Sequence, residues 1–210
     1  MVFKRGALIV IEGVDRTGKT TQCRNLVEGL KNKDVAAMYS NFPDRTSEIG
    51  KVINHYLTRK TEMSDETIHL LFSANRWEKC GEIIKQLETG TTLIIDRYCY
   101  SGVAFSGAKG LDINWCKNSD VGLPKPDKVF FLNMPLETAM QRNGFGNERY
   151  EVKNFQKKVL DVYMQLKDEK WDILDANRPM DIIQDELLQK TLEVVKNVSN
   201  EPLDKMWIYK

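Results

Sequence analysis

The sequence predicts a three-layer α/β fold, in which helices cover both faces of a parallel sheet. A glycine-rich loop directly follows the first apolar run, and further short apolar runs alternate with helical stretches along the chain. Continuous apolar runs of this length are typical of parallel strands that are buried on both faces. Strands that alternate with helices favour right-handed crossovers within one sheet. Ligands of such sheets bind at the carboxyl ends of the strands, so polar residues there are site candidates.

The predicted strands are short. They span Ala7–Ile11, Ala36–Ser40, Thr92–Ile95, Lys128–Leu132 and Trp171–Leu174. None approaches the roughly 20 apolar residues that a membrane-spanning helix needs, so no membrane partner is expected.

Two helices are predicted with clear boundaries, over Lys19–Lys31 and over Ser64–Glu88. The second begins with Ser-Asp-Glu, which supplies an N-cap and an acidic first turn, and it ends before Gly90. Pro135 and Pro179 are each expected at the first position of a further helix, where a missing N–H is tolerated.

Composition indicates a single domain over residues 1–210, because this length suits one sizeable core. The net charge of +1 and the scattered basic residues argue against a nucleic-acid partner. The four cysteines form no CxxC pair and no metal-binding spacing, and the N-terminus lacks a signal-peptide pattern. Reduced thiols and a cytoplasmic location are therefore expected, and nuclear or mitochondrial pools stay open.

Residues 13–20 read G-V-D-R-T-G-K-T, a complete phosphate-binding loop between a strand and a helix. In this position several backbone N–H groups and the positive end of a helix dipole point at one place. Gly13 and Gly18 allow the backbone to approach a phosphate, Lys19 can reach the β- and γ-phosphates, and Thr20 can ligate Mg²⁺. The sequence therefore predicts a nucleoside triphosphate site.

Two charged residues lie inside this loop, where most phosphate loops carry small or neutral ones. Arg16 can neutralise the transferred phosphoryl group, as an arginine finger supplied in cis. Asp15 can accept a hydrogen bond from a sugar hydroxyl of a second substrate. The alternative is that both are solvated loop charges.

The third strand ends in Asp96-Arg97-Tyr98. A carboxylate beside the phosphate loop is expected to organise Mg²⁺ together with Thr20, partly through water. Arg97 can clamp a phosphate with two parallel hydrogen bonds. The alternative for this string is a structural ion pair.

Further candidates for the second substrate follow the second strand and lie on the long helix. Arg45 is a second possible phosphate clamp, although a surface salt bridge is the alternative. His69, Phe72 and Arg76 share one helical face. Phe72 lies off the apolar stripe and can either stack on a base or pack in the core, while Arg76 can donate to a base carbonyl. His69 is predicted to be structural.

Residues 142–150 read R-N-G-F-G-N-E-R-Y. Two glycines between Arg142 and Arg149 predict a mobile flap over a nucleotide, within about residues 136–150. The alternative is an ordinary connection between helices. Asn177, in the turn after the last strand, is expected on the adenine side.

Together these residues closely resemble the eukaryotic form of the thymidylate kinase family. The resemblance covers nearly the whole chain and is most specific in five blocks that occur in the family's order, namely residues 13–21, 42–45, 70–77, 96–98 with 101–105, and 122–127. It implies a P-loop NTPase fold with strand order 2-3-1-4-5. It also implies the reaction ATP + dTMP → ADP + dTDP with Mg²⁺, dUMP as a weaker substrate, and a homodimer built around the long helix.

The resemblance also assigns roles to individual residues. Asp15 would meet the 3′-hydroxyl, Phe72 would stack on thymine, and Arg76 would bond a thymine carbonyl. The implied catalytic residues are Asp15, Arg16, Lys19, Arg97 and Arg142. The implied dTMP site is Asp15, Phe42, Arg45, Phe72, Arg76, Arg97, Ser101, Gly102, Phe105 and Tyr150. The expected ATP site is Gly13, Arg16, Thr17, Gly18, Lys19, Thr20, Thr21, Arg142 and Asn177, and the expected metal ligands are Thr20 and Asp96.

The chain departs from the family pattern at Phe105, where many relatives carry tyrosine, so discrimination at the sugar 2′ position is open. Arg16 indicates the family form with a basic residue in the loop, although Arg142 and Arg149 remain in the flap. A kinase for another acceptor, such as dGMP or a nucleoside, also stays open, although no glutamate is obviously placed as base for a 5′-hydroxyl. A nucleotide-dependent switch would need a guanine-reading N/T-K-x-D string, which the sequence lacks.

Overall fold

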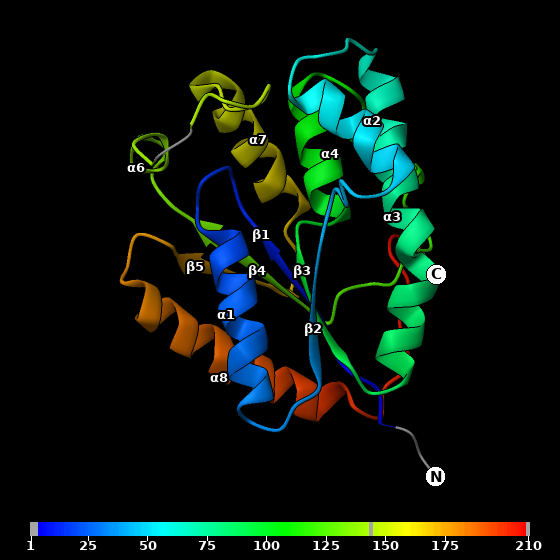
Figure 1. Cartoon of the computed structure of the whole chain (residues 1–210), viewed down its shortest axis with the longest axis vertical. Coiled ribbons are helices and arrows are strands. Elements are labelled where there is room, and N and C mark those ends of the chain that lie inside the picture. The colour runs from blue at the N-terminus through cyan, green and yellow to red at the C-terminus, as the bar shows by residue number, and fades with distance from the viewer. Residues whose placement is uncertain (1–3, 143–144, 209–210) are drawn as a thin grey trace.

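The computed structural model describes residues 4–142 and 145–208, and its central layer is a five-stranded sheet (Figure 1). The strands are β1 Leu8–Glu12, β2 Ala37–Asn41, β3 Thr92–Asp96, β4 Lys128–Asn133 and β5 Trp171–Asp175. They pair in parallel in the order β2-β3-β1-β4-β5. The predicted fold class and strand order are therefore confirmed.

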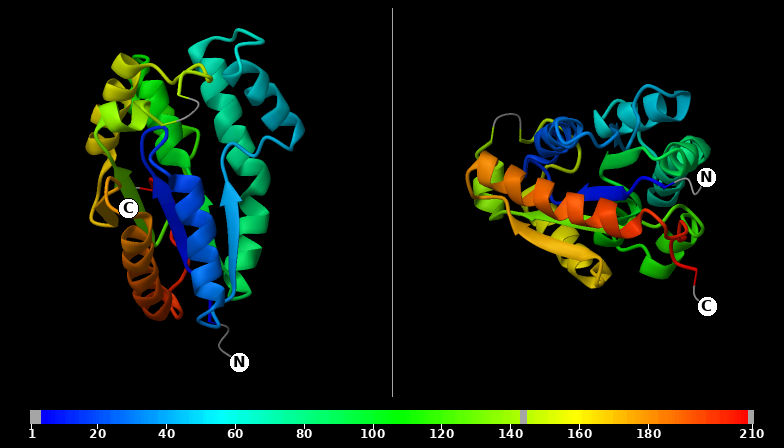
Figure 2. Two further views of the ribbon diagram at one scale, coloured as in Figure 1. Left: turned by 60° about the vertical axis from the view of Figure 1, so that its left-hand side comes forward. Right: turned by 90° about the horizontal axis from the view of Figure 1, so that it is seen from below.

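Helices cover both faces of the sheet (Figures 1 and 2). In β1, Ile9 and Ile11 pack into a cluster with α1 and α8, whereas Leu8 and Val10 pack into a cluster with α3, α4 and α7. Successive strand side chains point to opposite faces, so a strand between two helical layers is apolar along most of its length, as β1 is from Leu8 to Ile11. The helices are α1 Lys19–Lys31, α2 Glu48–Leu57, α3 Asp65–Glu88, α4 Cys99–Ala108, α5 Ile113–Asn118, α6 Leu136–Met140, α7 Lys153–Leu166 and α8 Met180–Val198.

The predicted boundaries of the long helix are confirmed. The Ser64 side chain accepts a hydrogen bond from the Thr67 N–H, and Gly90 follows the helix with a φ of 91°. The positions of the two prolines are wrong by one residue. Pro135 and Pro179 have extended ψ angles of 130° and 141°, so each caps its helix and the first helical residue is the next one.

The carboxyl edge of the sheet positions the site. β1 pairs with β3 so that Ile11 lies opposite Asp96, and this brings the phosphate loop beside the end of β3. Within the described part of the chain, no helix combines the length and the apolar character that crossing a membrane requires.

Candidate active site

The phosphate loop connects β1 to α1, and its backbone needs glycine at both ends. Gly13 has a φ of 149°, and a Cβ there would lie 2.6 Å from the Leu132 carbonyl oxygen. Gly18 has a φ of 93° and directly precedes α1. Arg16 adopts a left-handed φ of 66° although it is not glycine. Such a backbone is costly for a side-chain-bearing residue, and it persists where the surrounding structure fixes it.

Lys19 lies buried over the loop. Its Nζ donates to the Val14 carbonyl oxygen at 2.7 Å and to the Thr17 hydroxyl at 3.4 Å. Burial and, to a smaller extent, the Arg97 cation lower the pKa of Lys19 to about 8, although the carboxylates of Asp15 and Asp96 oppose this shift.

Thr20 and Asp96 form the oxygen pair expected for a metal. The Thr20 hydroxyl donates to Asp96 Oδ2 at 2.5 Å. Among the described residues, no cluster of three or more His, Cys, Asp or Glu side chains could hold a metal ion. Mg²⁺ usually takes only one or two protein oxygens and completes its shell with water and substrate phosphates. This pair therefore fits Mg²⁺ that arrives with a nucleotide.

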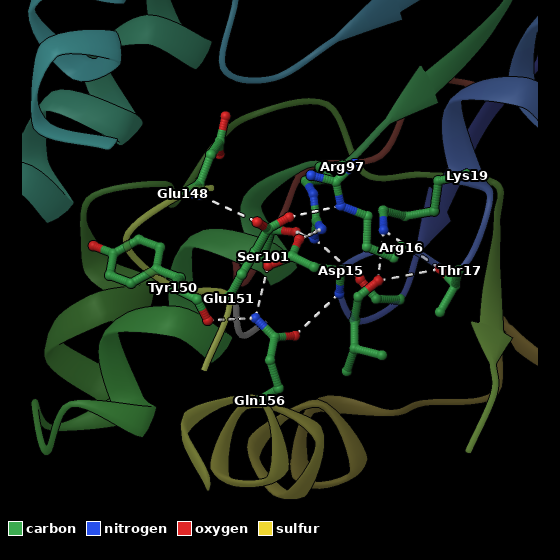
Figure 3. A network of polar contacts seen from close by, with 12 residues as sticks. Asp15, Arg16, Thr17, Lys19, Arg97, Ser101, Glu148, Tyr150, Glu151 and Gln156 are labelled. Carbon is green, nitrogen blue, oxygen red and sulfur yellow. Dashed lines mark hydrogen bonds and ion pairs between the residues drawn. The ribbon is translucent and has the colours of Figure 1, made fainter. Parts of the chain in front are cut away.

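Arg97 lies at the centre of the site (Figure 3). Its guanidinium forms an ion pair with the Asp15 carboxylate. Its Nη1 donates to the Gly13 carbonyl oxygen at 3.0 Å and to the Ser101 hydroxyl at 3.1 Å. The alternative of a structural ion pair is thus present in part, because Asp15 and Arg97 orient each other.

A largely apolar cavity lies on one side of Arg97. We call it the acceptor pocket. Phe72 and Arg76 on α3 line it, as do Phe42 after β2 and Phe105 on α4. The structure brings together every residue expected at the dTMP site, since all of them line this cavity: Asp15, Phe42, Arg45, Phe72, Arg76, Arg97, Ser101, Gly102, Phe105 and Tyr150.

His69 contributes to the wall behind this pocket and does have partners. Its Nδ1 lies 2.8 Å from the Ser106 hydroxyl, and its Nε2 lies 2.9 Å from the Cys116 carbonyl oxygen. Burial lowers the pKa of His69, which favours the neutral ring. These contacts support the structural role predicted for it.

Arg45 is exposed and pairs with Glu148 at 2.7 Å. The salt-bridge alternative is therefore realised, although both residues line the acceptor pocket. The sequence shows no glutamate obviously placed as a base for a 5′-hydroxyl, and the structure adds Glu148 to the lining of the acceptor pocket. Glu148 belongs to the segment predicted as a flap, but the sequence of that segment does not indicate which side chain lines this pocket.

A wider, more polar cavity lies on the other side of Arg97. We call it the donor cavity. Arg16, Gly18, Lys19, Thr20, Thr21 and Arg142 line it. Arg16 donates to Glu151 Oε1 at 2.7 Å, and Arg142 Nη1 donates to the Arg16 carbonyl oxygen at 2.9 Å. Asn177 lies in an exposed turn after β5, where its N–H bonds the Asp175 carboxylate, so its adenine role stays a prediction.

Comparison with known proteins decides the family. A family model described as thymidylate kinase matches residues 11–187. The chain belongs to the thymidylate kinase family. It is 50% identical over 207 residues to the thymidylate kinase of Arabidopsis thaliana, covering 98% of this chain and 79% of that protein. It is 44% identical over 211 residues to that of Homo sapiens, covering 99% and 100%.

A solved thymidylate kinase from Candida albicans has the same fold, with a TM-score of 0.87 and 38% identity. The match covers 96% of this chain and 98% of that one. As a member of the thymidylate kinase family, the chain is a phosphotransferase.

Sequence reasoning missed two buried residues that hold this thymidylate kinase site together. Gln156 on α7 donates to Asp15 Oδ2 at 2.7 Å and accepts from the Asp15 N–H at 3.0 Å. It also donates to the Tyr150 carbonyl oxygen at 2.9 Å (Figure 3). It therefore links the phosphate loop to Tyr150, and a lone glutamine on an amphipathic helix gives no signal for this.

Glu12, the other missed residue, accepts four hydrogen bonds. The donors are the N–H groups of Tyr98 and Ser101 and the hydroxyls of Ser101 and Tyr163. Burial raises the pKa of Glu12, although Arg97 and these donors oppose the shift. A carboxylate at the end of an otherwise apolar strand is the signal that could have identified it.

The segment predicted as a flap begins with α6 and ends at Tyr150. Asn143 and Gly144, part of its glycine motif, lie outside the described residues. Arg149 pairs with Glu62 at 2.7 Å and lies 4.1 Å from the centre of the Tyr56 ring. The carboxyl end of the segment is thus attached to α2 and the loop that follows it.

Proposed function

We propose that this protein transfers the γ-phosphoryl group of ATP to dTMP, giving ADP and dTDP in an Mg²⁺-dependent reaction. The observation that carries the proposal is that the acceptor pocket and the donor cavity meet at Asp15 and Arg97. One cavity is apolar and lined by aromatic rings, as a base requires. The other contains the phosphate loop. An acceptor phosphate on Arg97 would therefore face a γ-phosphate on the loop.

The mechanism follows from the chemistry of the acceptor. A phosphate monoester is largely dianionic at neutral pH and needs little help from a general base. Catalysis then depends on positioning and on neutralising the charge of the transferred group. Lys19 and Arg16 would neutralise that charge, and Arg97 with Arg45 would hold the acceptor phosphate. Bound Mg²⁺ would offset the negative charge of the β- and γ-phosphates, held through Thr20 and Asp96.

Acceptor choice would rest on the walls of the acceptor pocket. Phe72 would stack on the base, Arg76 would donate to a base carbonyl, and Asp15 would meet the 3′-hydroxyl. We expect dUMP to be weaker than dTMP because it lacks the methyl group that an apolar pocket would bury. Phe105 has no hydroxyl, and its ring packs 5.3 Å from that of Tyr150. Discrimination against a 2′-hydroxyl would then depend on steric fit.

Residues 136–150 would act as a lid over ATP. Arg142 already reaches the phosphate loop through the Arg16 carbonyl oxygen, and Glu148 pairs with Arg45 at the acceptor pocket. Such a segment can close over both substrates at once and exclude water.

We also propose a homodimer formed through α3. Leu70 and Trp77 lie on one face of this helix and are 49% and 40% exposed. Trp115 and Val121, from the neighbouring α5 region, are also large apolar side chains that remain exposed. Adjacent exposed apolar side chains mark an interaction surface, and the family resemblance favours a second copy as the partner. Leu70→Glu should give a monomer in sedimentation, whereas Ile182→Glu, an equally exposed control on α8, should not.

The experiment that tests the main proposal measures ADP release with ATP and Mg²⁺ against dTMP, dUMP, dGMP, dCMP, AMP and thymidine. We expect fast turnover of dTMP, slower turnover of dUMP and none of thymidine. The solved Candida albicans relative is described as having broad substrate specificity, so dGMP is the informative competitor. Turnover of thymidine but not dTMP would point instead to a nucleoside kinase that uses Glu148 as base. ATP binding without acceptor-dependent turnover would contradict both the dTMP kinase and the nucleoside kinase.

A further inference from the structure

A buried ion pair lies in the wall of the acceptor pocket. Arg76 on α3 donates from Nε to Asp120 Oδ1 at 3.0 Å and from Nη2 to Asp120 Oδ2 at 2.7 Å. The two side chains are 2% and 0% exposed. Two parallel hydrogen bonds of this kind fix the plane of the guanidinium as well as its position.

Asp120 is itself held rigidly by α3. The Ser73 hydroxyl lies 2.8 Å from Asp120 Oδ1 and 2.9 Å from the Ser119 carbonyl oxygen. One turn further along, the Trp77 Nε1 donates to the same Ser119 oxygen at 2.8 Å. The turn that carries Asp120 is therefore attached to the helix that carries Arg76, and the carboxylate cannot shift without breaking several bonds.

The ion pair determines which donors of Arg76 remain for a ligand. A guanidinium has five N–H donors and no acceptor, and Asp120 takes one on Nε and one on Nη2. A Cβ on Gly102 would lie 2.8 Å from Nη2 and 3.1 Å from Nη1, so these atoms face Gly102, which lines the pocket. The edge of Arg76 toward the pocket is thus made only of donors.

An edge made only of donors discriminates between bases. A carbonyl oxygen of a base can accept hydrogen bonds from the N–H groups of Arg76. An amino group of a base is itself a donor, so it would leave these buried N–H groups unpaired. The charge of Arg76 also needs compensation at this depth. Burial alone would lower the pKa of Arg76, and the Asp120 carboxylate raises it. Asp120 therefore allows a cation to stay in an apolar wall with its remaining N–H groups available.

We propose that Asp120 is a positioning residue for acceptor selection, which directs the free N–H groups of Arg76 toward a carbonyl oxygen of the base. The inference rests on the proposed function, because it requires the acceptor base to enter this pocket. Asp120 acts through Arg76 and touches no substrate atom. Gly102 contributes by leaving room for the guanidinium.

The first test is Asp120→Asn, which keeps the size of the side chain but removes its charge and one acceptor oxygen. We expect the KM for dTMP to rise about tenfold or more, the scale of losing a charge-assisted hydrogen bond. The KM for ATP should stay unchanged. Asp112→Ala is the matched control, because Asp112 caps α5 nearby through the Trp115 N–H and has no role toward Arg76.

The decisive test changes the substrate as well as the protein. The 5-methyl-2-pyrimidinone analogue of dTMP lacks the oxygen at position 4 and the proton on the neighbouring nitrogen. Wild-type protein should prefer dTMP over this analogue in kcat/KM, and Asp120→Asn should remove most of that preference. If the substitution lowers kcat/KM equally for both acceptors, Asp120 is merely structural and the inference is wrong. If wild-type protein has nearly equal kcat/KM values for dTMP and the analogue, the inference is also wrong.

A second variant guards against misfolding. Gly102→Ala keeps both partners of the ion pair but places a methyl group 2.8 Å from Arg76 Nη2, so the guanidinium must shift and the same preference for the carbonyl oxygen should weaken. Thermal unfolding of each variant checks that it is folded. Failure of the proposed function is distinguishable, because wild-type protein would then turn over neither dTMP nor the analogue.

Discussion

The acceptor pocket and the donor cavity differ in how their charged groups are satisfied. In the acceptor pocket, Arg76 is paired with Asp120, and aromatic side chains from several elements fill the walls. In the donor cavity, the cations bond groups of the phosphate loop and its neighbours. Lys19 donates to a loop carbonyl, and Arg16 donates to Glu151. The walls of the acceptor pocket are therefore fixed by side-chain packing. The cations of the donor cavity bond protein oxygens that phosphate oxygens could replace.

This difference separates two kinds of contribution. The apolar walls of the acceptor pocket bind the acceptor before the chemical step, so substitutions in these walls should mainly change the KM for the acceptor. Cations that can exchange a protein oxygen for a phosphate oxygen act on charge that develops during transfer, so damage there should appear in kcat. The four predictions below test that division.

The largest effect is expected for Arg16→Ala. If Arg16 neutralises the transferred group, kcat should fall by about 10²-fold or more, on the scale of arginine-finger losses, with little change in either KM. Steady-state kinetics with varied ATP and dTMP measures this. Lys51→Ala, which removes an exposed cation on α2, is the control. A change confined to KM would show that Arg16 does not stabilise the transition state, and the proposed division between the two cavities would then be wrong.

Arg97→Lys should have the next largest effect, because Arg97 lies where the two regions meet. Lysine keeps the charge but cannot reproduce the fork that binds Asp15, Gly13 and Ser101. We expect kcat/KM for dTMP to fall about 30-fold, as for one lost charge-assisted hydrogen bond. Unchanged kcat/KM would show that charge alone suffices at this position.

Phe72→Ala should act on the acceptor pocket alone. Stacking of a base on an aromatic ring contributes about 1–3 kcal/mol, so the KM for dTMP should rise by about tenfold or more while kcat changes little. Calorimetric titration with dTMP provides a measurement independent of turnover. A changed KM for ATP with an unchanged KM for dTMP would contradict the stacking role.

The smallest effect concerns the protonation of Lys19. Its pKa is lowered to about 8, so the free protein at pH 8 carries roughly half a proton on this amine. Nucleotide phosphates favour the charged form and raise the pKa. Binding at pH 8 should therefore take up about half a proton, and affinity should weaken as the pH rises above 8.

Calorimetry of ADP binding in two buffers with different ionisation enthalpies measures this proton uptake. Lys19→Arg is the control, because arginine stays protonated throughout this range. Uptake that persists in Lys19→Arg would assign the proton to another group. No uptake in the wild-type protein would mean that Lys19 is already charged before the nucleotide binds.

Local sequence motifs predicted much of the fold and of the donor cavity. The phosphate loop, the apolar strands and the Ser64 cap each depend on residues close in sequence, and each lies where the sequence predicts. The pairing of Thr20 with Asp96 also followed, since Thr20 is in the first turn of the helix after β1 and Asp96 ends the neighbouring strand β3.

The partners of the predicted residues were not predictable. Gln156 reaches Asp15 from 141 positions away, and Asp120 reaches Arg76 from 44 positions away. Such contacts depend on how helices pack against the sheet, and a single sequence contains no periodic signal for them. Sequence therefore identified many of the residues that line the two cavities, but not the residues that hold them in place.

The four hydrogen bonds of Glu12 have a consequence for how the protein acquires activity. They tie the end of β1 to the start of α4 and to Tyr163 on α7, three segments that are remote along the chain. A refolding molecule can recover most of its helices before α7 docks, because helix formation is local and fast. Glu12 would then lack one of its donors in the site. Recovery of catalytic turnover should therefore lag behind recovery of helical circular dichroism, so the enzyme's own activity reports the docking of α7.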